Sequence, residues 1–213
     1  GKVINKALAL NISSSNISLD KELYEALPNE GKEILDMFEL SGSMSSKVIL
    51  RKKRDEKKVR WRSDIFFDNI KGKYKKFPYP LENISGKIIL DQNGCKIEKC
   101  ESKDENFFAS VSGYIGKKDW NIEILSKELR LDKKLYDALD KEQRKIWKQF
   151  NPIGFVDVKF VTKKNEDIYI HIIPKNCSVM HEIFPYRLYE IIANPNVPKN
   201  GVHVRKNIIE FYG

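Results

Sequence analysis

The sequence predicts an α+β fold of mainly antiparallel strands: two tandem repeat units of a β-meander sheet, each with a helical insert. Three observations predict it: a gap-free internal match, a change of hydrophobic period within each copy, and short polar turns between candidate strands. The first unit covers residues 1–119 and the second residues 120–213, with helical inserts near 20–39 and 132–150. We expect the units to share one continuous sheet.

The internal match begins at Ile17 and recurs from Leu129, at the offset of 112 residues that separates Asp20 from Asp132. Both copies contain the pattern LDxxLYxAL. A second match, FPYPLENI from Phe77 and FPYRLYEI from Phe184, has an offset of 107 residues. The difference falls where the first copy has RKKRDEKKVRWR and the second KKNEDIYI. Because polar hairpin tips vary in length, we expect a hairpin there in each unit.

Each unit opens on an alternating strand, at 8–13 and at 120–125, and continues into a helical segment. Asp20 and Asp132 fit N-cap positions. Apolar residues then recur near helical spacing, and we expect these stripes to be buried against the unit's own sheet: Leu23, Leu27, Ile34 and Phe38, then Leu135, Leu139, Ile146 and Phe150. Pro28 and Asp140 share one repeat position, which predicts that a first helix ends there and a second begins.

After Gly42 and Gly154 the hydrophobic period changes to two, which predicts strands with one apolar and one polar face. On the return strand, Trp61, Ile65 and Phe67 share the apolar face, and Ile168, Ile170 and Ile172 repeat it in the second unit. Further strands are expected at 87–91, 95–99, 107–115 and around 202–211. The conserved pattern within the chain, including FPY, consists of packing and turn residues.

The cysteines and the remaining polar residues predict no catalytic, metal or cofactor site. Cys95 and Cys100 have odd spacing on one strand, which predicts opposite faces and a separation of about 16 Å. Cys177 takes the repeat position of Ile70, as a small packing residue would. His171 takes the position of Asp64 on the polar face and is expected to be solvated. With no phosphate loop, HExxH or GxSxG motif, we expect a protein that is not an enzyme.

The net charge of +9 comes mostly from lysine and suggests an anionic partner as an alternative. The one dense basic run ends near Trp61 and forms a candidate docking patch of Arg51, Lys52, Lys53, Arg54, Arg60 and Arg62. A basic nucleic-acid-binding module is therefore the second hypothesis, and a hydrolase with an unrecognised site is a third. Nucleic acid is the less favoured partner, because acidic residues interrupt the run and arginine is scarce.

The series LDKELYEALP, FELSGSMSSKVIL, FPYPLENISGKIIL, NGCKIEKCES and ASVSGYIG resembles the AsmA-like repeat proteins of bacterial envelopes, particularly the long ones of planctomycete-type bacteria. The resemblance implies a non-enzymatic segment of a larger protein, anchored in a membrane through another segment and projecting into the periplasm. It also implies an apolar sheet trough, or a scaffold, for lipid transport between membranes. That trough would be lined by Trp61, Ile65, Phe67, Ile168, Ile170 and Ile172. The expected partners are lipid or a membrane surface and further repeats of the same chain.

Overall fold

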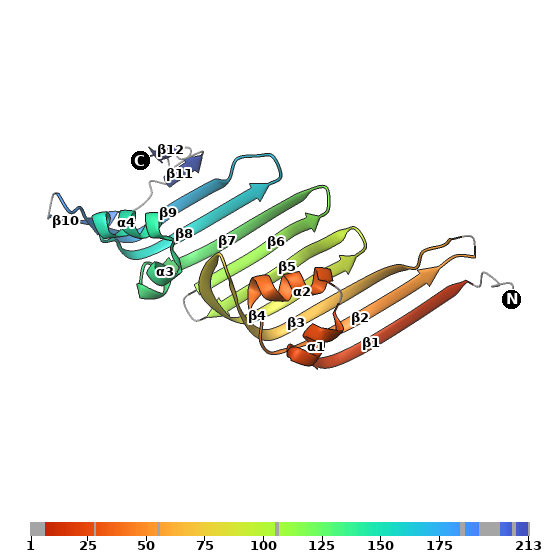
Figure 1. The fold of residues 1–213 in the computed structure, drawn as a ribbon. Helices are drawn as coiled ribbons and strands as arrows, with labels where there is room; N and C mark the ends of the chain where they lie inside the picture. The colour runs from red at the N-terminus through yellow and green to blue at the C-terminus, as the bar shows by residue number, and fades with distance from the viewer. Residues whose placement is uncertain are drawn as a thin grey trace.

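The strands of this protein form one antiparallel sheet (Figure 1). The structure, a computed structural model, describes residues 7–27, 29–54, 56–104, 107–183, 186–191, 201–205 and 208–212. In this part of the chain the strands are β1 (Leu8–Ser18), β2 (Ser43–Lys52), β3 (Arg60–Tyr74), β4 (Phe77–Asp91), β5 (Gly94–Asp104), β6 (Phe107–Gly116), β7 (Trp120–Arg130), β8 (Ile153–Lys163), β9 (Tyr169–Met180), β10 (Arg187–Ile191), β11 (Gly201–Arg205) and β12 (Ile208–Tyr212). Strands β1 to β9 follow one another in sequence order, then β11 and β12, and β10 pairs beside them with β9. The predicted continuous antiparallel sheet is confirmed.

Two helix pairs lie on the same face of the sheet (Figure 1). The first pair is α1 (Lys21–Ala26) and α2 (Asn29–Phe38), and the second is α3 (Lys133–Ala138) and α4 (Lys141–Phe150). Each pair starts at the predicted N-cap, because the Leu23 amide donates to Asp20 at 3.0 Å and the Leu135 amide to Asp132 at 3.2 Å. The backbone turns extended at the C-caps of α1 and α3, so the predicted break within each insert is confirmed.

The strand register gives the sheet two chemically different faces. On the apolar face, Ile88 lies between Ile65 and Ile97. A neighbouring row of the same face runs from β6 to β9 through Val111, Ile124, Phe160 and Ile170. On the charged face, Lys47 lies opposite Asp64. The helix pairs lie on the apolar face, since Leu23 packs on the cluster around Ile65. Period-two alternation in the sequence is the origin of both faces.

Together with the β3–β4 hairpin, the helices bury part of the apolar face. Two clusters form there: one of Met44, Ile65, Ile88, Cys95 and Cys100, the other of Leu129, Leu135, Val156 and Cys177. Leu135 and Ala138 of α3 are 6% and 3% exposed. The predicted burial of the whole stripe is wrong for the second helix of this pair, because Ile146 is 47% exposed and Phe150 is 38% exposed. Phe150 instead meets the ring of His181 edge-on at 4.9 Å.

The hairpin of β3 and β4 is longer than the sequence predicts and its end curves over the apolar face (Figure 1). Three register shifts interrupt its pairing between Phe67 and Tyr74. Tyr74 packs on Phe38 at 5.3 Å, and Tyr79 reaches Phe107 at 5.7 Å beside the second cluster. The FPY sequence at Phe77 therefore forms the start of strand β4 and not a turn. Its hairpin contacts both helix-covered regions, through Tyr74 and through Tyr79. Its counterpart at Phe184 lies outside the described residues.

The prediction that Cys95 and Cys100 point to opposite faces is wrong. Both side chains are buried in one cluster, at 6% and 8% exposure. The physical reason is a bulge, because the register of β5 against β6 shifts between Ile97 and Cys100. The extra residue restores both cysteines to the apolar face. The two remain free thiols, as does buried Cys177.

Candidate functional site

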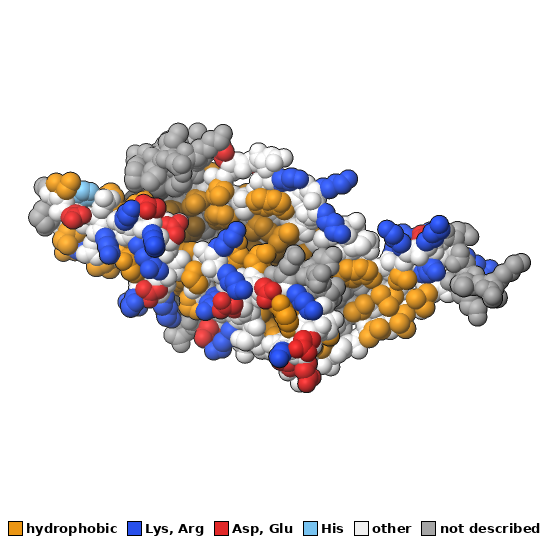
Figure 2. Space-filling view, in the orientation of Figure 1, with side chains coloured by type: hydrophobic (Ala, Val, Ile, Leu, Met, Phe, Trp, Pro, Cys, Tyr) orange, Lys and Arg blue, Asp and Glu red, His pale blue; other side chains and the backbone are white. Residues whose placement is uncertain are grey.

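Two parts of the apolar face carry exposed apolar side chains. On β1, Leu8, Leu10 and Ile12 are 44%, 43% and 46% exposed. Further along the sheet, Ile115 on β6 and Ile124 on β7 are 36% and 38% exposed. Figure 2 shows hydrophobic side chains gathered beyond the helices and over β1 and β2. We call these two groups the β1 patch (Leu8, Leu10, Ile12) and the β6–β7 patch (Ile115, Ile124).

The exposure of Ile124 is informative because β7 is an interior strand of the sheet. Ile124 pairs with Val111 on one side and with Phe160 on the other. An isoleucine between two apolar neighbours is usually covered by a second layer in a soluble protein. Here the neighbours are present and Ile124 is still 38% exposed. This surface can bury further apolar area by contact with another molecule.

The structure divides the predicted trough residues between covered and open surface. Ile65 is 8% exposed, and Phe67 and Ile172 pack against the two buried clusters. These three belong to the core. Trp61 is half-buried beside Leu50 on β2, and Ile168, just before β9, is 50% exposed. Ile170 is half-buried opposite Phe160 on the same face.

On the opposite face, ion pairs hold the charged residues together. Asp64 accepts from Arg62 Nε at 2.7 Å and lies 3.2 Å from Lys87 Nζ. Lys87 also contacts Glu98 at 3.2 Å. The hydrogen bond from Arg62 holds the pKa of Asp64 below its usual value, and the bond from Lys87 does the same to the pKa of Glu98. This cross-strand ladder is a solvated surface whose charges already have partners.

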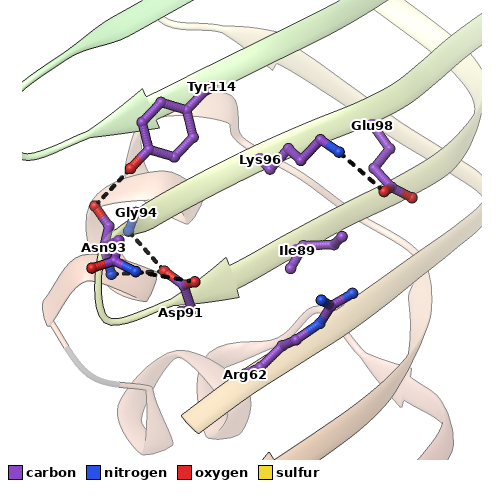
Figure 3. A pocket seen from close by; sticks show the side chains of 8 residues that line it. All are labelled: Arg62, Ile89, Asp91, Asn93, Gly94, Lys96, Glu98 and Tyr114. Carbon is purple, nitrogen blue, oxygen red and sulfur yellow. Dashed lines mark hydrogen bonds and ion pairs between the residues drawn. The ribbon is translucent and has the colours of Figure 1, made fainter. Parts of the chain in front are cut away.

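A polar hollow of about 330 Å³ lies on that charged face at one end of β3 to β6 (Figure 3). It is lined by Arg62, Ile89, Asp91, Asn93, Gly94, Lys96, Glu98 and Tyr114. The Tyr114 hydroxyl donates to the Asn93 carbonyl at 3.1 Å, and Lys96 contacts Glu98 at 3.4 Å. Its polar groups thus bond to one another, which leaves it a weaker candidate than the apolar patches.

The predicted basic docking patch does not form one surface. Arg51 lies opposite Arg60, and Arg62 lies on the same charged face. Two of these arginines already have acidic partners, since Arg60 pairs with Glu56 and Arg62 with Asp64. Lys52 is paired in register with Leu8 and so belongs to the apolar face. Lys53 and Arg54 lie at the tip of the β2–β3 hairpin.

The cysteines and histidines form no reactive constellation in the described part of the chain. Burial raises the pKa of both Cys95 and Cys100 to about 11, so their thiols stay protonated at neutral pH. His171 lies on the charged face opposite Lys159. No cluster of three metal-ligating side chains occurs among the described residues. The helices described are too short and too polar to cross a membrane.

Sequence reasoning missed the β1 patch. Leu8, Leu10 and Ile12 alternate in LALNIS, and that pattern predicts the strand. It does not predict what covers the strand, which depends on where the helices dock. Comparisons of this chain with protein-family models, with curated proteins and with solved structures gave no match.

Proposed function

We propose that this chain binds the acyl chains of lipids on the uncovered parts of its apolar sheet face. The observation that carries the proposal is the exposure of Ile124 in an interior strand, together with Leu8, Leu10 and Ile12 on the same face. Strands stand about 4.8 Å apart, so the face from β1 to β9 extends about 38 Å. That exceeds the roughly 15 Å of hydrocarbon in one bilayer leaflet, and so provides room for whole chains.

We further infer that the chain consists of two copies of one unit, as the sequence match suggests. Local backbone geometry supports this: Asn16 and Glu128, 112 residues apart, have φ angles of 55° and 54° at matching bulges. Gly42 and Gly154, also 112 apart, have φ angles of 125° and 124° after the two inserts. The φ angles of Gly42 and Gly154 are ones that glycine adopts without strain. The β1 patch then belongs to the first copy, and the β6–β7 patch lies where the two copies meet, with Ile115 from the first and Ile124 from the second.

The biological setting that we propose is a bacterial envelope, in a larger AsmA-like protein whose repeats extend the apolar face between membranes. The motif resemblance and the open apolar face support it. In this setting the segment is a non-enzymatic conduit or scaffold, and its partners are lipids and neighbouring repeats. Among the described strands β1 stands at one edge of the sheet, and a further strand can add to an edge strand.

Binding of acyl chains can be tested by titrating the purified chain with a fluorescent phosphatidylcholine. The variants are I124K and L10K, which place a charge on exposed positions of the two patches. Because both residues are about 40% exposed, the sheet should keep its melting temperature to within a few degrees. Lipid affinity should fall at least tenfold, because an acyl chain lying on the introduced lysine would have to remove water from its charge.

A matched control is Phe66→Lys, which changes an apolar residue of similar exposure, 43%, on the charged face. It should leave lipid binding unchanged. Equal losses in all three variants, or no saturable binding to the unmodified chain, would contradict the proposal. Binding of duplex DNA with a steep salt dependence, in place of lipid, would favour the nucleic-acid-binding hypothesis.

A further inference from the structure

We infer that the lipid bound on this face has an anionic headgroup, held by lysines at the β2–β3 and β6–β7 hairpin tips. The inference rests on the proposed function and adds the chemical class of the ligand. Both tips lie at the same end of the sheet, opposite to the end where the helix inserts connect the strands (Figure 1). Each tip borders one exposed patch, so each patch has a basic rim.

The β6–β7 tip places two lysines directly after exposed Ile115. Lys117 follows Ile115 by two residues, a distance of about 7 Å along the chain. The turn is held by the Gly116 amide, which donates to the Asp119 carbonyl at 2.8 Å, and by the Lys117 amide, which donates to the Asn93 carbonyl at 3.4 Å. Both Lys117 and Lys118 are exposed, and neither ammonium has an ion pair among the described residues. The backbone is therefore fixed while the charges remain available.

The β2–β3 tip repeats this arrangement beside the β1 patch. Lys52 pairs in register with Leu8, which puts the aliphatic stem of its side chain on the apolar face. The tip continues through Lys53 and Arg54 to Lys57 and Lys58, all four exposed. The carboxylate of Glu56 is taken up by Arg60, outside this group. Figure 2 shows the resulting basic side chains above the apolar surface at that end.

The β4–β5 tip provides an internal contrast. Its residues Gln92 and Asn93 carry no charge, and the Asp91 carboxylate accepts the Asn93 and Gly94 amides at 2.7 Å and 3.2 Å. Basic tips thus occur beside the exposed patches and not between them. Lysine next to apolar surface matches an anionic amphiphile, whose phosphate contacts the rim and whose chains lie on the strands. A nucleic acid would need a continuous basic groove instead.

The experiment compares binding to two kinds of vesicle, pure phosphatidylcholine and phosphatidylcholine with one-third phosphatidylglycerol, in a flotation assay. The variants K117Q/K118Q and K57Q/K58Q each neutralise two tip lysines. The matched control is K75Q/K76Q, which removes two exposed lysines from the β3–β4 turn at the other end of the sheet. All six side chains are exposed, so the variants should fold, and a thermal melt verifies this.

We expect the unmodified chain to prefer vesicles with phosphatidylglycerol, and each tip variant to lose that preference. Each lysine near an anionic surface strengthens binding by about fivefold, so two contribute roughly 25-fold. The control should retain the preference, and glycerol phosphate should not compete. Equal binding to both vesicles, or an equal loss in the control, would overturn this inference while leaving acyl-chain binding intact. If neither vesicle binds, the proposed function fails as well.

Discussion

The covered and the open parts of the apolar face are built from the same residue types but have opposite surroundings. In the covered parts, Ile65, Ile88 and Val156 are 8% exposed or less. In the open parts, Ile12 on β1 and Ile124 on β7 are 46% and 38% exposed in equally regular strands. The difference arises because the inserts and the curved β3–β4 hairpin cover only part of the face. It shows that strand pattern sets the chemistry of a face and that the insertions decide which part of it remains available.

The comparison predicts the largest loss of stability at the most buried position of the covered parts. Ile70 is 1% exposed, and Ile70→Ala should lower the free energy of unfolding by about 3–5 kcal/mol through lost burial and a cavity. The same truncation at Leu10, in the open parts, should cost less than about 1 kcal/mol. Urea denaturation followed by circular dichroism measures both. Similar values for the two variants would mean that the two positions are equally covered.

The second helix insert allows the same comparison of a buried with an exposed side chain, on its helices α3 and α4. Leu135→Ala should destabilise by about 2–4 kcal/mol, because this α3 side chain is 6% exposed in the second cluster. Ile146→Ala on α4 should change stability by about 0.5 kcal/mol or less, since Ile146 is 47% exposed. Thermal melts of the pair suffice. A larger effect at Ile146 would show that α4 packs on something else in solution.

A smaller effect is expected at the N-cap of the covering helix pair. Asp132→Ala removes the acceptor of the Leu135 amide and should cost about 1 kcal/mol. Asp132→Asn keeps an acceptor and should recover most of that loss. Failure of the asparagine variant to recover would show that the carboxylate acts through its charge rather than through this hydrogen bond.

The smallest effect should come from the charged face and should depend on pH. The pKa of Asp64 is lowered by the hydrogen bond from Arg62, and that of Glu98 by the bond from Lys87. A lowered carboxyl pKa stabilises the fold above the unfolded value of about 4, and this contribution is lost as pH falls through the folded pKa. Asp64→Asn should therefore lower the melting temperature slightly at pH 7, and this difference should shrink as the pH falls through the lowered pKa of Asp64. A difference that persists at low pH would contradict the ion-pair explanation.

Much of the fold could be predicted from the sequence because its signals are local. Alternation in LALNIS and N-caps at Asp20 and Asp132 depend only on neighbouring residues. The sequence did not predict the bulges, because an extra residue in a strand leaves no local signal in the alternation. Its effect is large: the extra residue near Glu98 reverses which face the later side chains occupy, as Cys100 shows. The start of β4 at Phe77 was also not predicted, because three register shifts interrupt the pairing of β3 with β4 between Phe67 and Tyr74. Of the candidate trough, Ile65 was misplaced because its cover comes from Leu19 and Leu23, whose docking is a long-range property.

The central claim, that acyl chains lie on the uncovered parts of the apolar face, is tested most directly by photo-crosslinking. A phosphatidylcholine with a diazirine at the end of one chain would be bound, irradiated and mapped by peptide mass spectrometry. We predict labelling of β1 around Leu10 and of β6 and β7 around Ile115 and Ile124, with little on α4 or the charged face. Labelling concentrated around exposed Ile146, or spread equally over both faces, would contradict the account.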